Sequence, residues 1–313
     1  MLVGSQPVIA VIGSAARQAV RNAVGTILVD VSLLTLNDPG ALSAPSMLVA
    51  FDAWVDAGSA STTAASLLGA GGEVIGRLNA DRLFDYRARR PTLEIVDGRP
   101  SELTWPELEI RRRRYGERDL LILSGPEPDF RWQQLGRELI DMARQVGVVE
   151  WLSIGAIPAA VPHTRPVPIL GTASQPGLLR GDVQAGPEGV LRVPAAAIST
   201  LDIAAARAGI PAIGYYAQVP HYVSGPYPAA AVALLHAVSH HIGAQIALGD
   251  LAQEAIDLRT KLDTAAAMDD ATRAYVDRLE SMVDEARLPS GDELISEIER
   301  FLRESGSEGS QRP

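Results

Sequence analysis

The residues best placed to do chemistry are a histidine and an arginine, His163 and Arg165, in a proline-rich stretch between two apolar runs. Proline fixes φ and biases the preceding residue toward extended backbone, so Pro162 and Pro166 predict a stiff loop. An imidazole and a guanidinium on such a loop can both donate hydrogen bonds to an anion or a carbonyl oxygen. The alternative is a structural loop whose two side chains bind carbonyls or carboxylates of the chain itself.

Other candidates lie after other predicted strands. Gly58 and Ser59 fall where an alanine-rich helix begins. Free N–H groups at a helix start can hold an anion or a carbonyl, although N-capping alone explains the same residues. Glu127 and Asp129 stand in a segment rich in proline and glycine, and we expect Asp129 to cap a helix that begins at Phe130. Either carboxylate could instead pair with an arginine or accept a hydrogen bond from a ligand.

Two further groups complete the binding candidates. His221 and Tyr222 begin another loop at a strand end and could approach His163. Arg87 and Arg90 belong to an arginine cluster that could clamp a carboxylate or a phosphate. An interface between subunits uses arginine equally well, so the cluster alone does not separate these two roles.

Metal and acid/base sites are weakly indicated. Asp52 and Asp56 follow a predicted strand and, with a histidine, could do acid/base work or bind Mg²⁺, but nothing in their spacing requires it. His236 and His240 have the i, i+4 spacing of helical metal pairs. No adjacent glutamate or obvious third ligand accompanies them, so packing or partner contact is favoured over zinc. We therefore assign no metal, no cofactor and no catalytic residue.

Composition excludes several classes of function. The 313 residues carry a net charge of −10 at pH 7, which argues against a general nucleic-acid binder. Cysteine is absent, which excludes disulfides and thiol catalysis, and Lys261 is the only lysine, which removes P-loop and Schiff-base chemistry from most of the chain. No Gly-x-Ser-x-Gly elbow, Walker loop or Gly-x-Gly-x-x-Gly fingerprint is present. The residues alone therefore indicate candidate binding sites, but they do not identify a reaction.

Localisation follows from hydropathy. No stretch reaches the ~20 apolar residues of a membrane span. The nearest, residues 226–248, is interrupted by three histidines, and the first residues lack the early positive charges of a signal peptide. We expect a soluble cytoplasmic protein.

Alternating strands and helices must position these side chains. Apolar runs at 47–51, 120–123, 149–154 and 212–218 end in loops rich in glycine or proline and alternate with helical stretches, while residues 73–115 have a β-like pattern. This order predicts an α/β fold with a mostly parallel central sheet covered by helices on both faces. Ligands of such sheets bind at the carboxyl ends of the strands, where the His163 loop is expected.

The pattern also divides the chain into four segments: a poorly determined N-terminal extension of strand, helix and strand (1–36), an α/β/α core domain (37–244), a helical appendage (245–304) and a tail that is disordered by composition (305–313). Within the appendage we expect helix N-caps at Asp269 and at Ser290 or Asp292.

Four stretches carry a resemblance to a known family and two more support it; they are Asp52–Ser59, Asp85–Pro91, Ser124–Asp129 with Trp132, and Ile157–Pro158 through Val161–Pro166, then Pro220–Tyr222 with Pro226–Ala230, and Leu288–Leu294. By their order and spacing over about residues 47 to 302, the chain resembles the proteasome assembly chaperone 2 family in its high-GC bacterial branch. The part before Asn37 is not covered.

The resemblance implies a three-layer α/β/α fold similar to the nucleoside phosphorylase/hydrolase group, a helical C-terminal appendage and a homo-oligomer, with a trimer favoured. Eukaryotic and archaeal members are similar to chaperones that help to assemble the proteasome core, some through a tail of a hydrophobic residue, a tyrosine and one final residue. The end of this sequence, Gly309–Pro313, does not match that tail. Some bacterial members carry the label carboxylate–amine ligase, which no ATP-binding loop supports here.

Two functions remain open. The first is an oligomeric assembly or interaction protein, with proteasome subunits as candidate partners and neither nucleic acid nor membrane among them. The second is a small-molecule binder or enzyme with a strand-end pocket, in which Arg165 or the Gly58 helix start holds an anion and His163 or His221 transfers a proton. Likeness to phosphorylases does not decide between them. We favour the non-enzymatic role.

Overall fold

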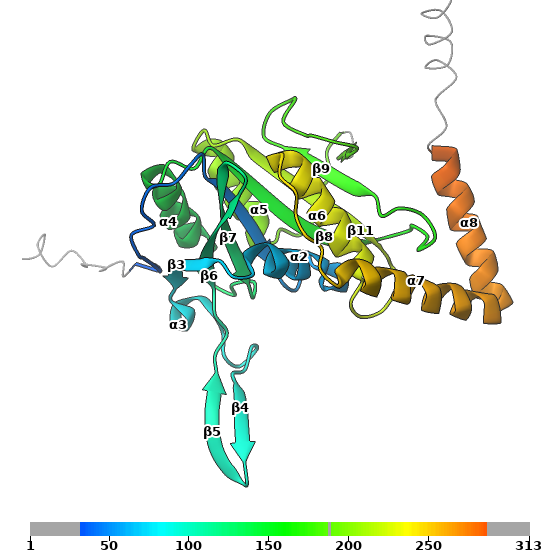
Figure 1. Ribbon diagram of the computed structural model, residues 1–313, viewed down its shortest axis with the longest axis horizontal. Coiled ribbons are helices and arrows are strands. Elements are labelled where there is room, and N and C mark those ends of the chain that lie inside the picture. Colours follow the sequence, from blue (N-terminus) through cyan, green and yellow to red (C-terminus); the bar gives the residue numbers. More distant parts are fainter. Residues whose placement is uncertain (1–31, 187–188, 287–313) are drawn as a thin grey trace, which may run out of the picture. The chain divides into compact units, whose positions relative to one another are not determined.

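A nine-stranded sheet organises the part of the chain that the structure describes, residues 32–186 and 189–286 of this computed structural model (Figure 1). The strand order is β1-β3-β6-β7-β2-β8-β11-β9-β10. The bounds are β1 (Leu34–Leu36), β2 (Ser46–Phe51), β3 (Glu73–Leu78), β6 (Glu109–Tyr115), β7 (Arg118–Gly125), β8 (Glu150–Ala159), β9 (Ile169–Ala173), β10 (Gln184–Ala185) and β11 (Ala212–Pro220).

Parallel pairing is concentrated at the centre of this sheet. Strands β7, β2, β8 and β11 are parallel neighbours, whereas β1, β3, β6 and β7 pair antiparallel with one another and β9 pairs antiparallel with β11. Strand β2 is buried along all six residues, as expected of a strand that is covered on both faces. The predicted α/β class is confirmed, and the sheet as a whole is mixed.

Helices cover the sheet on both faces. The described helices are η1 (Ala57–Ser59), α2 (Ala60–Gly69), α3 (Ala80–Leu83), α4 (Trp132–Gln145), α5 (Ala197–Arg207), α6 (Pro228–Ile242), α7 (Leu251–Met268) and α8 (Asp270–Ala286). Helices α2 and α6 pack together on one face, and α4 and α5 pack together on the other (Figure 1). Strand β2 alternates between two cores, with Leu48 and Ala50 beside α2 and α6, and Met47 and Val49 beside α4 and α5.

The predicted appendage begins with α7, which packs on α6, and continues into α8, which packs on α7. Asp269 caps α8 as expected, since its Oδ2 accepts the Thr272 N–H at 2.9 Å. Ser290, Asp292, the predicted tail and residues 1–31 of the predicted extension lie outside the described residues. Strand β1 falls inside that extension, yet it pairs with β3 at the sheet edge. Within the described residues, no helix combines the length and apolarity that crossing a membrane requires.

A separate two-stranded sheet is formed by β4 (Thr92–Val96) and β5 (Arg99–Thr104). Every residue of both strands is exposed, and Figure 1 shows this hairpin extending away from the nine-stranded sheet. The β-like pattern of residues 73–115 therefore covers two different structures. Strands β3 and β6 belong to the large sheet, and the hairpin between them does not.

Candidate functional site

The proline-rich loop lies at the carboxyl end of β8, as predicted, and it is bound to the C-terminal helices. His163 is only 3% exposed. Its backbone N–H donates to the Tyr222 hydroxyl at 2.7 Å, its Nδ1 lies 2.7 Å from the same hydroxyl, and its Nε2 lies 3.2 Å from Asp263 Oδ1 on α7. Because Tyr222 accepts from the backbone, it can donate to Nδ1, which leaves Nε2 to donate to Asp263. Burial lowers the pKa of His163, although the Asp263 carboxylate opposes this.

The next two residues of the loop bind α8. Thr164 Oγ1 donates to Glu280. Arg165 donates to both carboxylate oxygens of Asp284, at 3.0 Å from Nε and 2.7 Å from Nη2, and its Nη1 lies 3.2 Å from Glu280. The contacts of His163–Arg165 with α7 and α8 are called the loop clamp below. They match the structural alternative, in which the donors of the loop bind carboxylates of the chain itself.

His221 and Tyr222 extend the loop clamp into an aromatic cluster. Tyr222 contacts His163 directly, and the rings of His221 and Tyr222 are 5.8 Å apart. His221 Nδ1 lies 3.0 Å from the Ala159 carbonyl, and its Nε2 lies 3.0 Å from the hydroxyl of Tyr275 on α8. Both imidazoles are thus held between the strand ends and the appendage.

The hydrogen-bond donors at the start of α2 are bound by a carboxylate of the chain itself. Asp56 Oδ1 accepts from the Ser61 N–H and hydroxyl, both at 2.7 Å, and its Oδ2 accepts from the Thr62 hydroxyl. The predicted anion pocket at Gly58 and Ser59 is therefore already occupied by the Asp56 carboxylate. Gly58 has a packing role instead, because its φ is +63° and a Cβ there would lie 2.7 Å from the Cβ of Tyr227.

The prediction that Asp129 caps a helix is wrong. Helix α4 begins at Trp132, and Arg131 before it has a φ of 61°, so this left-handed residue separates Asp129 from the helix start. Asp129 Oδ2 instead accepts the Asp85 N–H at 2.7 Å. Glu127 is the residue that caps a helix, since its Oε1 accepts the Ala197 N–H at 2.7 Å at the start of α5.

The two aspartates considered for acid/base work do not share a site, and the arginine cluster is divided as well. Asp52 forms a bidentate pair with Arg89, at 2.7 and 3.2 Å, and does not share a site with Asp56. Arg87 and Arg90 are exposed, and within the described residues their side chains have no hydrogen-bond or ion-pair partner. They stay candidates for contact with a partner.

A buried ionic network was not foreseen from the sequence. His241, 1% exposed, has Nδ1 2.6 Å from the Tyr215 hydroxyl and Nε2 3.3 Å from Glu150 Oε2. Burial by itself raises the pKa of Glu150, but hydrogen bonds from His241 and Ser46, together with Arg118, lower it to about 2. A charged residue at the start of an apolar strand was the available signal. The network links β8 to α6 and has a structural role.

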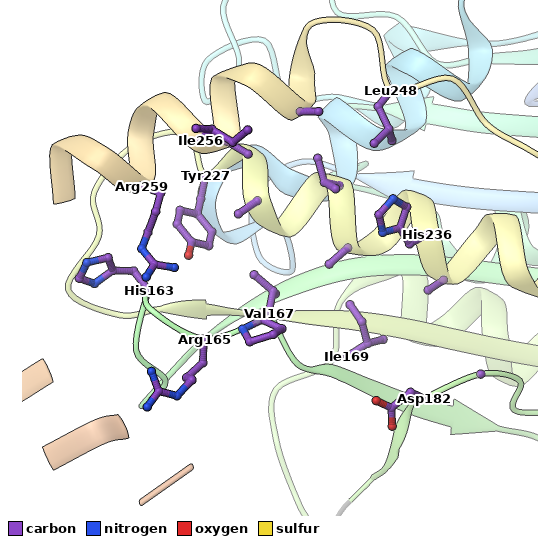
Figure 2. Close-up of a pocket in the computed structure, with 18 of the residues that line it drawn as sticks. His163, Arg165, Val167, Ile169, Asp182, Tyr227, His236, Leu248, Ile256 and Arg259 are labelled. Carbon is purple, nitrogen blue, oxygen red and sulfur yellow. The ribbon is translucent and has the colours of Figure 1, made fainter. Parts of the chain in front are cut away.

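A cavity of about 880 Å³ opens near these groups, and it is lined by α6, by α7 and the loop before it, and by the segments around β9 (Figure 2). Its apolar walls are formed by Val167, Ile169, Val232, Ala233, Leu248 and Ile256. Tyr227 and Arg259 also line it and were not predicted. Tyr227 stands between two prolines before an apolar helix, which is a usable signal, whereas Arg259 lies in a charged helix with no distinguishing pattern.

His236 and His240 line the same cavity from α6. The described residues contain no group of three or more histidine, aspartate or glutamate side chains that could hold a metal ion. In this structure both histidines form part of the cavity wall.

Comparisons with known proteins identify the family. The model of the PAC2 family matches residues 50–266. No curated protein matches the chain. Three solved structures are similar: a protein of unknown function from Corynebacterium glutamicum (TM-score 0.75, 29% identity, 80% of this chain and 97% of that chain), a proteasome-assembly chaperone homologue from Mycobacterium tuberculosis (0.67, 33%, 74% and 99%), and a PAC2 family protein from Streptomyces avermitilis (0.65, 36%, 74% and 99%). The resemblance seen in the sequence is confirmed, and this chain belongs to the PAC2 family.

Proposed function

We propose that this protein is a homo-oligomeric assembly or interaction protein, related in role to proteasome-assembly chaperones, and that it is not an enzyme. Most of the side chains that the sequence offered for chemistry, including His163, Arg165 and Glu127, bind other parts of the chain. The observation that carries the proposal is the β4–β5 hairpin, whose apolar face no described residue covers.

One face of the hairpin is apolar. Leu93 pairs with Leu103, and Ile95 pairs with Pro100. Leu93, Ile95 and Leu103 are 47%, 59% and 49% exposed. An isolated two-stranded hairpin is marginally stable in water, and burial of each such side chain contributes favourably to association. The hairpin therefore fits a contact arm that is covered in an oligomer.

The other face of the hairpin is acidic. Glu94 lies directly opposite Glu102, an arrangement that is unfavourable for like charges. The base of the hairpin is anchored, since the rings of Tyr86 and Trp105 meet edge to face with their centroids 4.7 Å apart. On an anchored arm of this kind, the apolar face is the one expected to meet a partner, and the charged face is expected to stay in solvent.

The partner class is suggested by the family. A relative that is 33% identical is described as a proteasome-assembly chaperone homologue. We therefore propose a trimer of this chain as the active species and unassembled proteasome subunits as its partners. Arg87 and Arg90, which precede the hairpin and have no side-chain partner among the described residues, supply a cationic contact for them.

The test is size-exclusion chromatography with light scattering, on the protein alone and mixed with unassembled proteasome α subunits. We expect the mass of a trimer alone and a defined complex in the mixture, which the assembled core particle does not form. The double variant Arg87→Gln, Arg90→Gln should keep the trimer and weaken the complex. A monomer would overturn the oligomer, and failure to bind any subunit at micromolar concentration would overturn the chaperone role.

A further inference from the structure

The cavity beside α6 contains a buried hydroxyl that has no partner in the described part of the chain. Tyr227 is only 4% exposed, and Figure 2 shows its hydroxyl directed into the cavity. No described residue makes a hydrogen bond with that hydroxyl. A buried hydroxyl without a hydrogen bond costs free energy, so an acceptor atom of a ligand at this position would be stabilised.

A guanidinium lies beside this hydroxyl. Arg259 on α7 donates from Nε to both oxygens of Asp263 at 3.0 Å, and within the described residues its two Nη groups have no partner. Arg259 is near enough to influence the titration of Tyr227, and Figure 2 shows its guanidinium close to that ring. The free Nη groups of Arg259 can only donate, and the Tyr227 hydroxyl beside them can donate too. They therefore call for an acceptor, and a carboxylate accepts from both a guanidinium and a phenol.

The rest of the cavity favours a hydrocarbon chain. Its walls continue from Arg259 along α6 and α7 as the apolar residues named above, and its volume of about 880 Å³ lies in the range of small-molecule sites. Asp263 balances the charge of Arg259, and Asp182 lines the cavity as well. Arg165 and Arg180 line it too, the first paired with Asp284 and the second donating to the His241 carbonyl. Because Asp263 already lies beside Arg259, the anchoring end suits a ligand with one negative charge better than one with two.

We propose that this cavity binds a monocarboxylate with a medium-length hydrocarbon chain, its carboxylate held by Arg259 and Tyr227 and its chain lying between α6 and α7. The anchors differ from those that the sequence suggested. His163, Arg165 and the Gly58 helix start are used within the chain, whereas the donors of Arg259 and Tyr227 remain available. The proposal is independent of the assembly role.

Calorimetric titration of the full-length protein with sodium decanoate tests it. We expect saturable binding of one decanoate per protomer, with decanol and decyl phosphate binding about tenfold or more weakly, because the first lacks the charged acceptor and the second adds a charge. Absence of saturable decanoate binding would overturn the proposal. Equal affinity for decanoate and decanol would also overturn it, because the donors would then have no role.

Variants separate the anchors from general stability. Tyr227→Phe should weaken decanoate binding several-fold and leave the melting temperature of the free protein unchanged or higher, because the hydroxyl has no partner to lose. Arg259→Gln should weaken binding about tenfold or more. Arg278→Gln, an exposed arginine on α8 without a partner among the described residues, is the matched control. An equal loss in the control, or unchanged binding by Tyr227→Phe, would contradict the assignment.

A filling substitution tests the chain-binding part. Ala233→Leu places additional side-chain volume on the apolar wall of α6, so it should reduce binding of decanoate and decanol alike. Light scattering on each variant should show an unchanged oligomer. Failure of decanoate to bind would thus be distinguishable from failure of the assembly proposal. Unchanged decanoate binding by Ala233→Leu would place the ligand outside the cavity and overturn the proposal.

Discussion

The loop clamp and the β4–β5 hairpin differ in whether their side chains have partners elsewhere in the described part of the chain. The polar side chains of the loop clamp do, and the apolar side chains of the hairpin do not. The loop clamp is built from a histidine, a threonine and an arginine, and its donors are taken by carboxylates of α7 and α8. The hairpin offers little for chemistry, yet its leucines and isoleucine face solvent. Residue type alone pointed to the loop as the functional region. Because the polar groups of the loop are bound within the chain and the apolar side chains of the hairpin are not covered by described residues, the structure favours the hairpin as the region that contacts a partner.

The two regions also differ in what their contacts contribute. Full burial of a fully exposed leucine or isoleucine contributes about 1.5–3 kcal/mol, and the half-exposed side chains of the hairpin would contribute about half of that each. Ion pairs at a surface contribute little, because solvent screens them and two long side chains must be ordered. Substitutions in the hairpin should therefore have large effects on association, and those in the loop clamp should have smaller effects on folding.

The largest effect is expected from Leu93→Glu combined with Leu103→Glu. These residues are paired on the apolar face of the hairpin, and the double substitution places two charges where an interface would be dry. We expect the dissociation constant of the oligomer to rise by about 100-fold or more, measured by light scattering over a concentration series. The control is Glu94→Gln with Glu102→Gln on the opposite face, which should leave the oligomer intact. An unchanged mass for the leucine variant would remove the hairpin from the interface.

In the loop clamp, His163→Ala should have the largest effect. The substitution removes the Nδ1 partner of the buried Tyr222 hydroxyl and the Nε2 contact with Asp263, while the backbone N–H of residue 163 keeps its bond to Tyr222. We expect the free energy of unfolding to fall by about 1–3 kcal/mol in urea titrations at neutral pH. His236→Ala is the matched control, because His236 is exposed and makes no hydrogen bond or ion pair with the described residues, so its loss should change stability little. Equal stability of the two variants would show that the loop is not held by His163.

The contribution of His163 should also appear, as a smaller effect, in the pH dependence of the free energy of unfolding. Burial lowers the pKa of His163 below its ordinary value of 6.5, so the unfolded chain binds a proton more readily than the folded chain. The stability that His163 contributes is therefore fully present above about pH 6.5 and is lost as pH falls through the lower folded pKa. Urea titrations between about pH 8 and pH 5 should show a steeper decline for the natural protein than for His163→Ala. Parallel declines would mean that His163 is not buried in solution.

The elements of the fold could be predicted where local pattern and burial agree. The apolar run at 47–51 became β2 because a strand covered on both faces needs no polar alternation. Strand β8 extends to Ala159, past the predicted apolar run at 149–154, because β11 continues to pair with it through Ala159. Helix α4 begins two residues late because Arg131 adopts a left-handed conformation that helix propensity does not reveal.

The candidate site was harder to predict because its partners are distant in the chain. His163 meets Asp263 and Arg165 meets Asp284, and nothing local to the loop indicates which of many carboxylates will lie there. The hairpin was missed for a different reason. Alternating residues such as Leu93, Glu94 and Ile95 are equally typical of a sheet strand, so separation from the sheet leaves no trace in the pattern.

The smallest effect is expected at the Arg165–Asp284 pair, and it tests whether the outer part of the loop clamp contributes at all. The pair is bidentate, with distances of 3.0 and 2.7 Å, but both side chains remain partly exposed and Glu280 offers Arg165 a second partner. A double-mutant cycle of Arg165→Ala and Asp284→Ala isolates the pair from the other contacts of each residue. We expect a coupling energy that is favourable, well below the effect of His163→Ala, and weaker in about 1 M salt, where the Debye length falls to about 3 Å. A coupling as large as the His163 effect, or one insensitive to salt, would mean that the pair is shielded from solvent. The loop would then share the role that we propose for the hairpin, that of a surface covered by a partner.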